Sequence, residues 1–270
     1  MSDSSSENIY SFDGADPEMH QAYERAQSTF RYFWREMAWE RRRIIPALNL
    51  ACVKAPFSDG DQAEGHPDDF EVEHMWISEV DFDGRNVSGT LLNVPNNLKS
   101  IAQGDAVTLP LEQISDWMYA IAGEVYGAYT VNLMRSRMSP RERMSHDSAW
   151  GLDFGDPTKI RLVPEPKQGK GLLKSWFGKR SAETDEHPMS ENMAVSLVAE
   201  IEKDKSILTS QDDQGWTVLH HEALAGSAPT VKVLLDAGAD PKALTRDGRT
   251  ALELARSLGW ENVVSLLLRR

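Results

Sequence analysis

Two stretches near the carboxyl end set the fold of the last third of the chain: GWTVLHHEALAG (215–226) and GRTALELARSLG (248–259). They align without gaps at an offset of 33 residues, and each begins and ends with glycine. The alignment continues downstream, where apolar residues at 231–235 match apolar residues at 264–268. An internal repeat of this length indicates a stack of similar structural units.

Each stretch carries the signals of a short helix followed by a turn. Thr217 and Thr250 can cap the amino end of the helix, and Gly226 and Gly259 suit the left-handed conformation that often follows a helix. A helix pair cannot bury its apolar face alone, so neighbouring pairs must stack. The period, the threonine–x–leucine–histidine signature and the AGAD connector (237–240) resemble the ankyrin repeat.

This resemblance implies an all-α ankyrin repeat stack over residues 191–270. We expect a degenerate cap at 191–211 and repeats at 212–245 and 246–270. Such a stack usually binds proteins and seldom catalyses reactions. Because at least three repeats are usually needed for stability, we expect this short stack to dock onto the rest of the chain.

The adjacent residues His220, His221 and Glu222 raise the question of a metal site. Neighbouring helix residues point about 100° apart, and the i, i+4 spacing of helical zinc motifs is missing, so we predict no metal. The resemblance implies that His220 makes a local structural hydrogen bond. His221 and Glu222 replace the usual leucine and alanine, and polar groups at core-like positions need partners.

The amino-terminal part predicts an α+β domain, in which helices pack on an antiparallel sheet. Residues 16–42 have a single apolar stripe at helical spacing, with Asp16 as the N-cap. EVEHMWISEV (71–80) is the clearest strand and is predicted to be central, with Val72, His74, Trp76 and Val80 on one face. TKIRLVPEP (158–166) is expected to form one more edge strand.

Four short motifs in this part have a resemblance of their own. EHMW (73–76), GTLLNVP (89–95), GD (104–105) and ISDW (114–117) resemble the bacterial YegJ-type domain of unknown function. That resemblance implies a small α+β domain without an established activity. We therefore divide the chain into a disordered tail (1–15), a YegJ-like α+β domain (16–164), a linker (165–190) and the ankyrin stack (191–270).

Composition narrows the class of protein further. The net charge is −13, and a surface of this sign repels phosphate backbones, so nucleic acid is not a predicted partner. No apolar run reaches the length of a membrane helix, and a signal peptide is not recognisable at the amino terminus. With Cys52 as its single cysteine, the chain cannot form an intramolecular disulfide. We predict a cytoplasmic protein.

The sequence predicts a protein-binding role without a cofactor. A nucleophile elbow, a phosphate loop and metal-ligand spacing are missing, so we predict that the chain is not an enzyme. Between Asp59 and Asp83 there are ten acidic residues and no Lys or Arg, which favours a basic protein partner. Exposed Trp and Arg are typical binding anchors. The predicted contact residues are Asp59, Asp61, Glu64, Asp68, Asp69, Trp216, Arg246, Arg249 and Trp260.

Three functions fit these features. The sharpest expectation is an immunity protein, or antitoxin, that neutralises a bacterial toxin such as a basic nuclease by binding and occluding it. The first alternative is an adaptor or chaperone for a secretion or regulatory partner. The second alternative is an enzyme with a site near His74 and Asp116. For the tryptophans, the alternative to exposure is packing within the stack.

Overall fold

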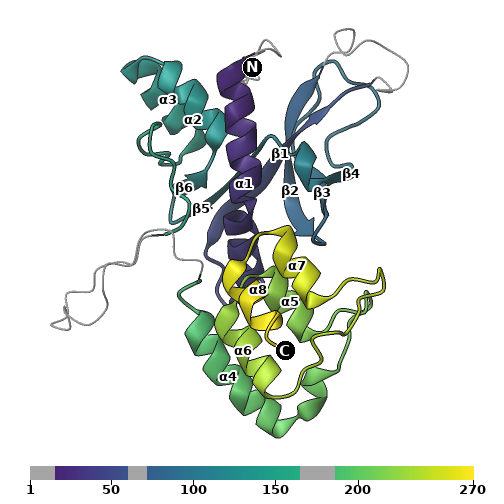
Figure 1. Ribbon diagram of the computed structural model, residues 1–270. Helices are drawn as coiled ribbons and strands as arrows, with labels where there is room; N and C mark the ends of the chain where they lie inside the picture. Colours follow the sequence, from purple (N-terminus) through teal and green to yellow (C-terminus); the bar gives the residue numbers. More distant parts are fainter. Residues whose placement is uncertain (1–15, 60–71, 165–185) are drawn as a thin grey trace, which may run out of the picture.

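The computed structural model describes residues 16–59, 72–164 and 186–270 (Figure 1). The predicted tail at 1–15 and most of the predicted linker, at 165–185, lie outside these residues. The amino-terminal domain contains α1 (Pro17–Glu40), β1 (Leu48–Phe57), β2 (Glu73–Phe82), β3 (Asn86–Leu91), β4 (Ala106–Pro110), the 3-10 turn η2 (Leu111–Gln113), β5 (Asp116–Ile121), β6 (Glu124–Gly127), α2 (Tyr129–Arg137) and α3 (Pro140–Trp150).

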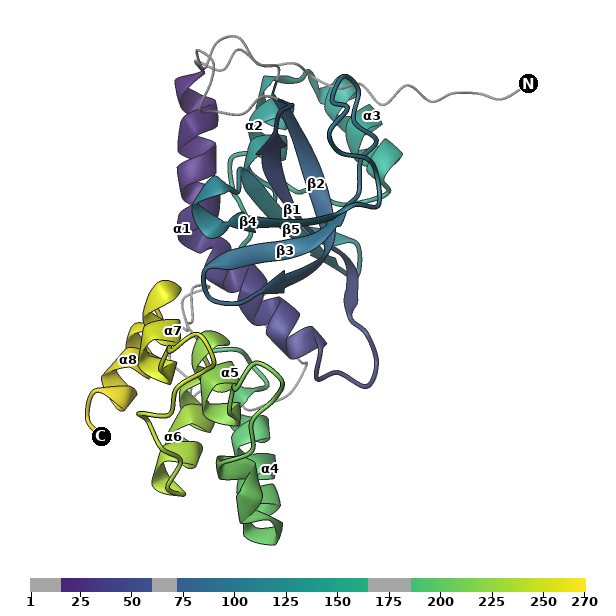
Figure 2. The same cartoon turned by 90° about the vertical axis from the view of Figure 1, so that its right-hand side faces the viewer.

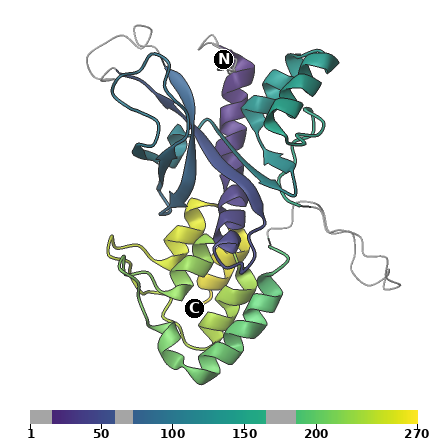
Figure 3. The same ribbon diagram turned by 180° about the vertical axis from the view of Figure 1, so that it is seen from behind.

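The six strands form one antiparallel sheet in the order β4-β3-β2-β1-β5-β6. β2 is central, as its apolar faces predict. The fold class is therefore confirmed: an antiparallel sheet with packed helices, followed by a helical ankyrin region. Figure 3 shows α1 between the β1–β4 side of the sheet and the α2–α3 pair.

Two sequence predictions about strands are wrong. Val80 does not share a face with Trp76, because Glu79 has a left-handed backbone (φ 51°) and the register shifts between Ser78 and Asp81. This β-bulge turns Val80 to the face of Ile77, toward α1. Among the described residues of the predicted edge strand, 158–164, none is in a strand.

Helix α1 covers one face of the sheet with the stripe that the sequence predicts. Asp16 caps it by accepting a hydrogen bond from the Glu18 N–H at 3.0 Å. Ala26 and Phe33 are fully buried, and the Trp117 indole donates to the Ala26 carbonyl at 2.8 Å. The opposite face is closed by a second apolar cluster that includes residues of α2 and of the segment after α3: Cys52, Trp76, Met118, Ala120, Val125, Ala128, Val131 and Phe154.

The carboxyl-terminal domain is a two-layer stack of helices (Figure 2). Its elements are α4 (Ser190–Lys203), the 3-10 turn η3 (Lys205–Leu208), α5 (Val218–Leu224), α6 (Ala228–Asp236), α7 (Ala251–Ser257) and α8 (Glu261–Leu267). α4 packs on α6 and α6 on α8, while α5 packs on α7. α4 and η3 fall where the sequence predicts a degenerate cap, and α5–α6 and α7–α8 fall in the two predicted repeats.

Gly226 shows why the turn between paired helices needs glycine. Its φ is +73°, and a Cβ at this position would lie 2.4 Å from the indole of Trp260. Trp260 is buried and donates from its indole N–H to the Leu224 carbonyl at 3.0 Å. The turn between α5 and α6 therefore packs against Trp260 in the turn between α7 and α8, and this contact sets the spacing of the repeats.

Candidate functional site

The polar centre of the amino-terminal domain is Asp116, which is fully buried. Its Oδ1 accepts from the N–H groups of Trp117 and Tyr129 at 2.9 Å, and its Oδ2 accepts from the N–H and hydroxyl of Thr130 at 2.8 and 2.6 Å. These bonds anchor the start of α2. Burial raises the pKa of the Asp116 carboxyl and lowers the pKa of the neighbouring Lys54 ammonium. With four donors satisfied, Asp116 acts as a structural cap.

His74 lies beside Asp116 but has different neighbours. Its Nδ1 is 2.9 Å from the Ser115 hydroxyl, and its ring stacks on Tyr23 with centroids 5.3 Å apart. Burial and the charge of Lys54 lower the pKa of His74 to about 4, so the ring is neutral at pH 7. Ser115 is only 2% exposed. The pair has the chemistry of a histidine-activated hydroxyl, but this hydroxyl is shielded from a substrate.

The acidic segment is only partly described. Asp61, Glu64, Asp68 and Asp69 lie outside the described residues. Asp59 is described, and its carboxylate accepts hydrogen bonds from the N–H groups of Lys99 and Ser100 at 2.8 to 3.0 Å and from the Ser100 hydroxyl at 2.6 Å. The Asp59 carboxylate therefore ties β1 to the loop that precedes β4.

The predicted binding anchors of the ankyrin stack divide into two groups. Arg246 is exposed at a loop tip, and its N–H donates to the Gln214 carbonyl of the neighbouring tip at 2.9 Å. The expectation that Trp216, Arg249 and Trp260 are exposed is wrong, since they are 6%, 6% and 1% exposed. Trp216 packs in the stack, and Arg249 and Trp260 are covered by the amino-terminal domain.

The carboxyl-terminal half of α1 makes the first contact between the domains, and Figure 2 shows it passing along the upper side of the stack. Arg31 Nη1 donates to the Gly259 carbonyl at 3.1 Å, and its guanidinium lies 5.6 Å from the ring centroid of Trp260. Tyr32 meets the same indole edge to face at 6.4 Å. The helix therefore lies across the turn between α7 and α8.

A two-point ion pair of this interface joins Arg42 to Glu222. The guanidinium reaches both carboxylate oxygens, at 2.8 and 3.1 Å. Thr230 also donates its hydroxyl to Glu222 at 2.6 Å. This explains the unusual glutamate in the repeat: its partner comes from the domain on which the stack docks. The other departure, His221, lies 3.0 Å from Asp212 at the surface.

His220 has the structural role that the ankyrin resemblance implies. Its Nδ1 accepts from the Thr217 N–H at 3.0 Å, so its Nε2 carries the proton and donates to the Ala243 carbonyl at 3.1 Å. The ring is fully buried, and burial lowers its pKa. Across the described parts of the chain, His, Cys, Asp and Glu form no group of three or more that could hold a metal ion.

The β2–β3 turn makes a second contact, on the helices α5 and α7. A Cβ on Gly84 would lie 2.7 Å from Leu254 Cδ2, 2.8 Å from Arg249 Nη1 and 3.7 Å from Leu224 Cδ1. The φ of Gly84 is +93°. A glycine at the tip therefore lets the hairpin touch the α5–α7 layer of the stack.

The segment before α4 makes a third contact, although the sequence assigns residues 186–190 to the linker. His187 is buried, stacks on Trp39 with centroids 4.8 Å apart, and lies 3.4 Å from Glu36. Arg43 contacts the same carboxylate at 2.8 Å. The predicted linker extends too far at its carboxyl end. The polar composition of this segment gave no sign that His187 packs against α1.

The residues that join the domains were not predicted as a site. Glu36 lies on α1, which the sequence predicts only from its apolar stripe, and Arg42 follows the end of this helix. Only Glu222 gave a signal, as a charged residue in a core-like position. Among the described residues, no helix has the length and apolar character to cross a membrane.

Fold and contacts together define a class of protein: an α+β domain fused tightly to a short ankyrin stack. The chain belongs to the family described as "Uncharacterized protein conserved in bacteria (DUF2314)", whose model matches residues 16–154. The model "Ankyrin repeats (3 copies)" matches residues 189–270.

Individual bacterial proteins are similar to the whole chain or to part of it. The chain is 44% identical over 260 residues to the ankyrin repeat protein NMB1133/NMB1171 of Neisseria meningitidis serogroup B, covering 96% of each protein. It is 30% identical over 80 residues to the uncharacterized protein YegJ of Escherichia coli K12, which is 30% of this chain and 46% of YegJ.

Among solved structures, the Bd0816 predatory endopeptidase of Bdellovibrio bacteriovorus in complex with immunity protein Bd3460 matches 30% of this chain and 42% of that chain. The identity is 24% and the TM-score is 0.28. A likeness of this size carries no conclusion about function.

Proposed function

We propose that this protein is a non-enzymatic binding protein that neutralises a bacterial toxin by binding and occluding it. The observation that supports the binding role is the ankyrin stack. Its loop tips lie at the surface, whereas its α5–α7 layer packs against the amino-terminal domain. The tips carry Asp213, Gln214 and Arg246, which are exposed. The hydrogen bond between Arg246 and Gln214 joins the two tips into one surface.

The charge of the chain supports a basic partner. A net charge of −13 steers a cationic protein toward the surface and repels nucleic acid. Nucleases that act on phosphate backbones have basic grooves, so an acidic inhibitor would match such a groove in charge. The acidic run from Asp59 to Asp83 is the part of the sequence best suited to this role.

The contacts between the domains support occlusion by a single body. The Arg42–Glu222 pair, the Gly84 turn and the His187–Trp39 stack hold the stack against α1 and the sheet. A partner bound at the tips would therefore also face the amino-terminal domain. Pre-organised surfaces bind with a smaller entropic cost than surfaces that must assemble on binding.

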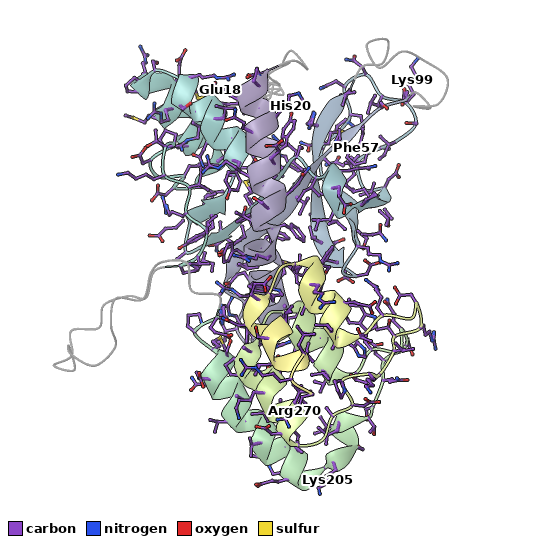
Figure 4. The ribbon with its side chains drawn as sticks, viewed as in Figure 1. Glu18, His20, Phe57, Lys99, Lys205 and Arg270 are labelled. Carbon is purple, nitrogen blue, oxygen red and sulfur yellow. The ribbon has the colours of Figure 1, made fainter. Side chains whose placement is uncertain are left out.

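The test is binding to the product of a toxin gene next to the gene for this chain, measured by calorimetry at 50 and 500 mM salt. We expect a 1:1 complex that weakens at least tenfold at high salt and protects cells that express the toxin. Asp213→Lys, at an exposed tip, should weaken binding to a basic partner. Glu202→Lys is the matched control, because Glu202 is exposed on α4 and Figure 4 places Lys205, three residues further along, at the end of the stack away from the other domain.

Two results would separate the alternatives. Binding to several exchangeable partners, without protection from a toxin, would favour an adaptor or chaperone. The His74–Ser115 contact is the observation that favours an enzyme, and in that case His74→Ala would abolish an activity without unfolding the chain.

A further inference from the structure

The two edges of the sheet differ in how the chain covers them. At one edge, the segment after α3 covers β6: the Val125 N–H donates to the Asp153 carbonyl at 2.9 Å, and the Gly127 N–H donates to the Arg161 carbonyl at 2.8 Å. The other edge is β4, with the sequence AVTLP (106–110). In Figures 1 and 3, no described element lies beyond β4. The described part of the chain therefore closes one edge of the sheet and leaves the other open.

The hydrogen bonds at the two ends of β4 show which of its backbone groups point outward. In an antiparallel pair, every second residue bonds to the partner strand. The Leu91 N–H donates to the Asp105 carbonyl and the Leu111 N–H donates to the Arg85 carbonyl, both at 2.9 Å. The register between β3 and β4 is regular, so positions 107 and 109, at steps of two between these bonds, face β3. The residues whose backbone groups point outward are Ala106, Thr108 and Pro110.

These outward groups are available to an added strand. Ala106 and Thr108 each offer an N–H and a carbonyl, and Pro110 offers a carbonyl; no described residue bonds to them. The three side chains are exposed and uncharged. Natural sheets often protect an open edge with a charged side chain, a bulge or a covering element, and the described residues supply none of these at β4. Pro110 blocks only one position, because its missing N–H is on the outward side.

The charges around this edge are mostly negative. Asp105 precedes β4 and Glu112 follows it, and both are exposed. Glu79 adds a third carboxylate, which accepts from the hydroxyl of Thr90 on β3 at 2.8 Å. Arg85, near Glu112, is basic, so the four charged residues sum to −2. An extended segment with Lys or Arg at its ends would complement this charge, whereas a second copy of this chain, at −13, would be repelled.

We propose that the open edge of β4 pairs with an extended, basic segment of the partner protein, which adds a seventh strand to the six-stranded sheet. Asp105 and Glu112 favour Lys or Arg at the ends of this segment. Figures 1 and 3 show β4 on the same side of the molecule as the loop between α6 and α7, so one partner can contact both. The inference rests on the proposed binding function, but a defined peptide tests it without the toxin.

The probe is the peptide acetyl-KTVTVTK-amide, added to the full chain. Its matched controls are acetyl-KTVPVTK-amide, which lacks the central N–H, and acetyl-ETVTVTE-amide, which reverses the charge. By fluorescence polarisation, we expect each control to bind about tenfold more weakly. Hydrogen exchange followed by mass spectrometry should slow at Ala106 and Thr108, because Pro110 has no N–H and Val107 and Leu109 are already bonded to β3.

Two variants connect the binding to the edge. Thr108→Pro removes an outward N–H and leaves the bonds to β3 in place, as Pro110 already does, so it should weaken the basic peptide about tenfold. Thr108→Ala is the matched control: it keeps the N–H and should bind like the parent chain. If Thr108→Pro does not fold, Glu112→Lys should weaken the basic peptide about threefold and strengthen the acidic peptide by the same factor.

Three outcomes would overturn the proposal. One is no binding of the basic peptide up to about 2 mM. Another is equal binding by Thr108→Pro and the parent chain. The third is a dimer of the parent chain in sedimentation that Thr108→Pro abolishes, which would assign the edge to a second copy.

The peptide and the toxin give separate answers. If the chain binds the basic peptide at β4 but binds no toxin, the toxin proposal fails and the edge remains a site for a basic segment. If the toxin binds Thr108→Pro as tightly as the parent chain, the toxin proposal stands and the role of β4 is refuted.

Discussion

Replacing Arg42 with methionine should uncouple the two domains and destabilise the ankyrin stack. Glu222 is 3% exposed, and Arg42 reaches both of its carboxylate oxygens, at 2.8 and 3.1 Å. After Arg42→Met, the carboxylate keeps only the Thr230 hydroxyl at 2.6 Å. A buried charge without its partner is among the most costly defects in a folded protein.

The size of the effect follows from the burial of each partner. Breaking a buried pair by removing one partner costs about 3–5 kcal/mol. The side chain of Arg42 is 21% exposed, so water screens the pair and can reach the carboxylate. We therefore expect a loss of about 2–3 kcal/mol in the free energy of unfolding, which lowers the melting temperature by roughly 5–10 °C when the two domains unfold together as one chain of this length.

The opposite replacement should be milder. Glu222→Ala restores the residue found at the matching position of the second repeat, Ala255. The Arg42 guanidinium can keep its contact with the Trp39 ring, 4.7 Å from the ring centroid, and it can be hydrated because the side chain is 21% exposed. We expect a loss of about 1 kcal/mol. The double variant should be more stable than Arg42→Met alone, because the unpaired buried charge is gone.

The assay is urea unfolding of the three variants and the parent chain, analysed as a double-mutant cycle. Arg41→Met is the matched control, since its partner is the exposed Asp81 at 3.0 Å and exposed pairs contribute less than about 1 kcal/mol. The reasoning is refuted if Arg42→Met costs no more than Arg41→Met, or if the effects of the two single replacements simply add.

Three further predictions concern other contacts. Gly84→Ala should cost more than about 1 kcal/mol by urea unfolding and expose the domain junction to limited proteolysis, since its Cβ would lie 2.7 Å from Leu254 at a φ of +93°; an unchanged cleavage pattern would contradict this. Trp260→Ala should cost about 3–5 kcal/mol. If α1 depends on the stack, calorimetry should show a lower unfolding temperature for both domains; an unchanged unfolding transition of the amino-terminal domain would show that it does not. Burial lowers the pKa of His187, so the unfolded chain takes up a proton at higher pH than the folded one. Stability should be complete above pH about 6.5 and fall as the pH is lowered toward the folded pKa. His187→Asn should flatten this part of the profile, measured as urea midpoints between pH 7.5 and 5; equal slopes would exclude His187 as the cause. Glu36 stays ionised in this range, because the hydrogen bond from His187 and the charge of Arg43 outweigh its burial and lower its pKa.

The sequence was sufficient for elements whose signals are local. Asp16 caps the start of α1, as predicted. The glycines at 226 and 259 adopt the expected left-handed conformation, because a residue without Cβ is needed where two helices turn.

The sequence was not sufficient where two distant segments meet. The bulge at Glu79 could not be predicted from the sequence, because regular alternation through the strand places Val80 on the face of Trp76, and only the register shift reverses this. Trp216 and Trp260 were interpreted as exposed because loop tips and turns usually are, but Trp216 packs within the stack and Trp260 is covered by α1. Burial at an interface depends on the partner surface, and a single repeat cannot reveal which of its faces will be covered.

The docking of the stack also limits how a partner can be bound. The Gly84 turn lies against Leu224 and Leu254 of the α5–α7 layer, and α1 lies across the turn at Gly259. A partner that used these surfaces would first have to displace the amino-terminal domain, including the buried Arg42–Glu222 pair. The loop tips around Arg246 need no such displacement. Of the surfaces that the described part of the stack offers, the tips are therefore where a macromolecular partner can bind at the lowest cost.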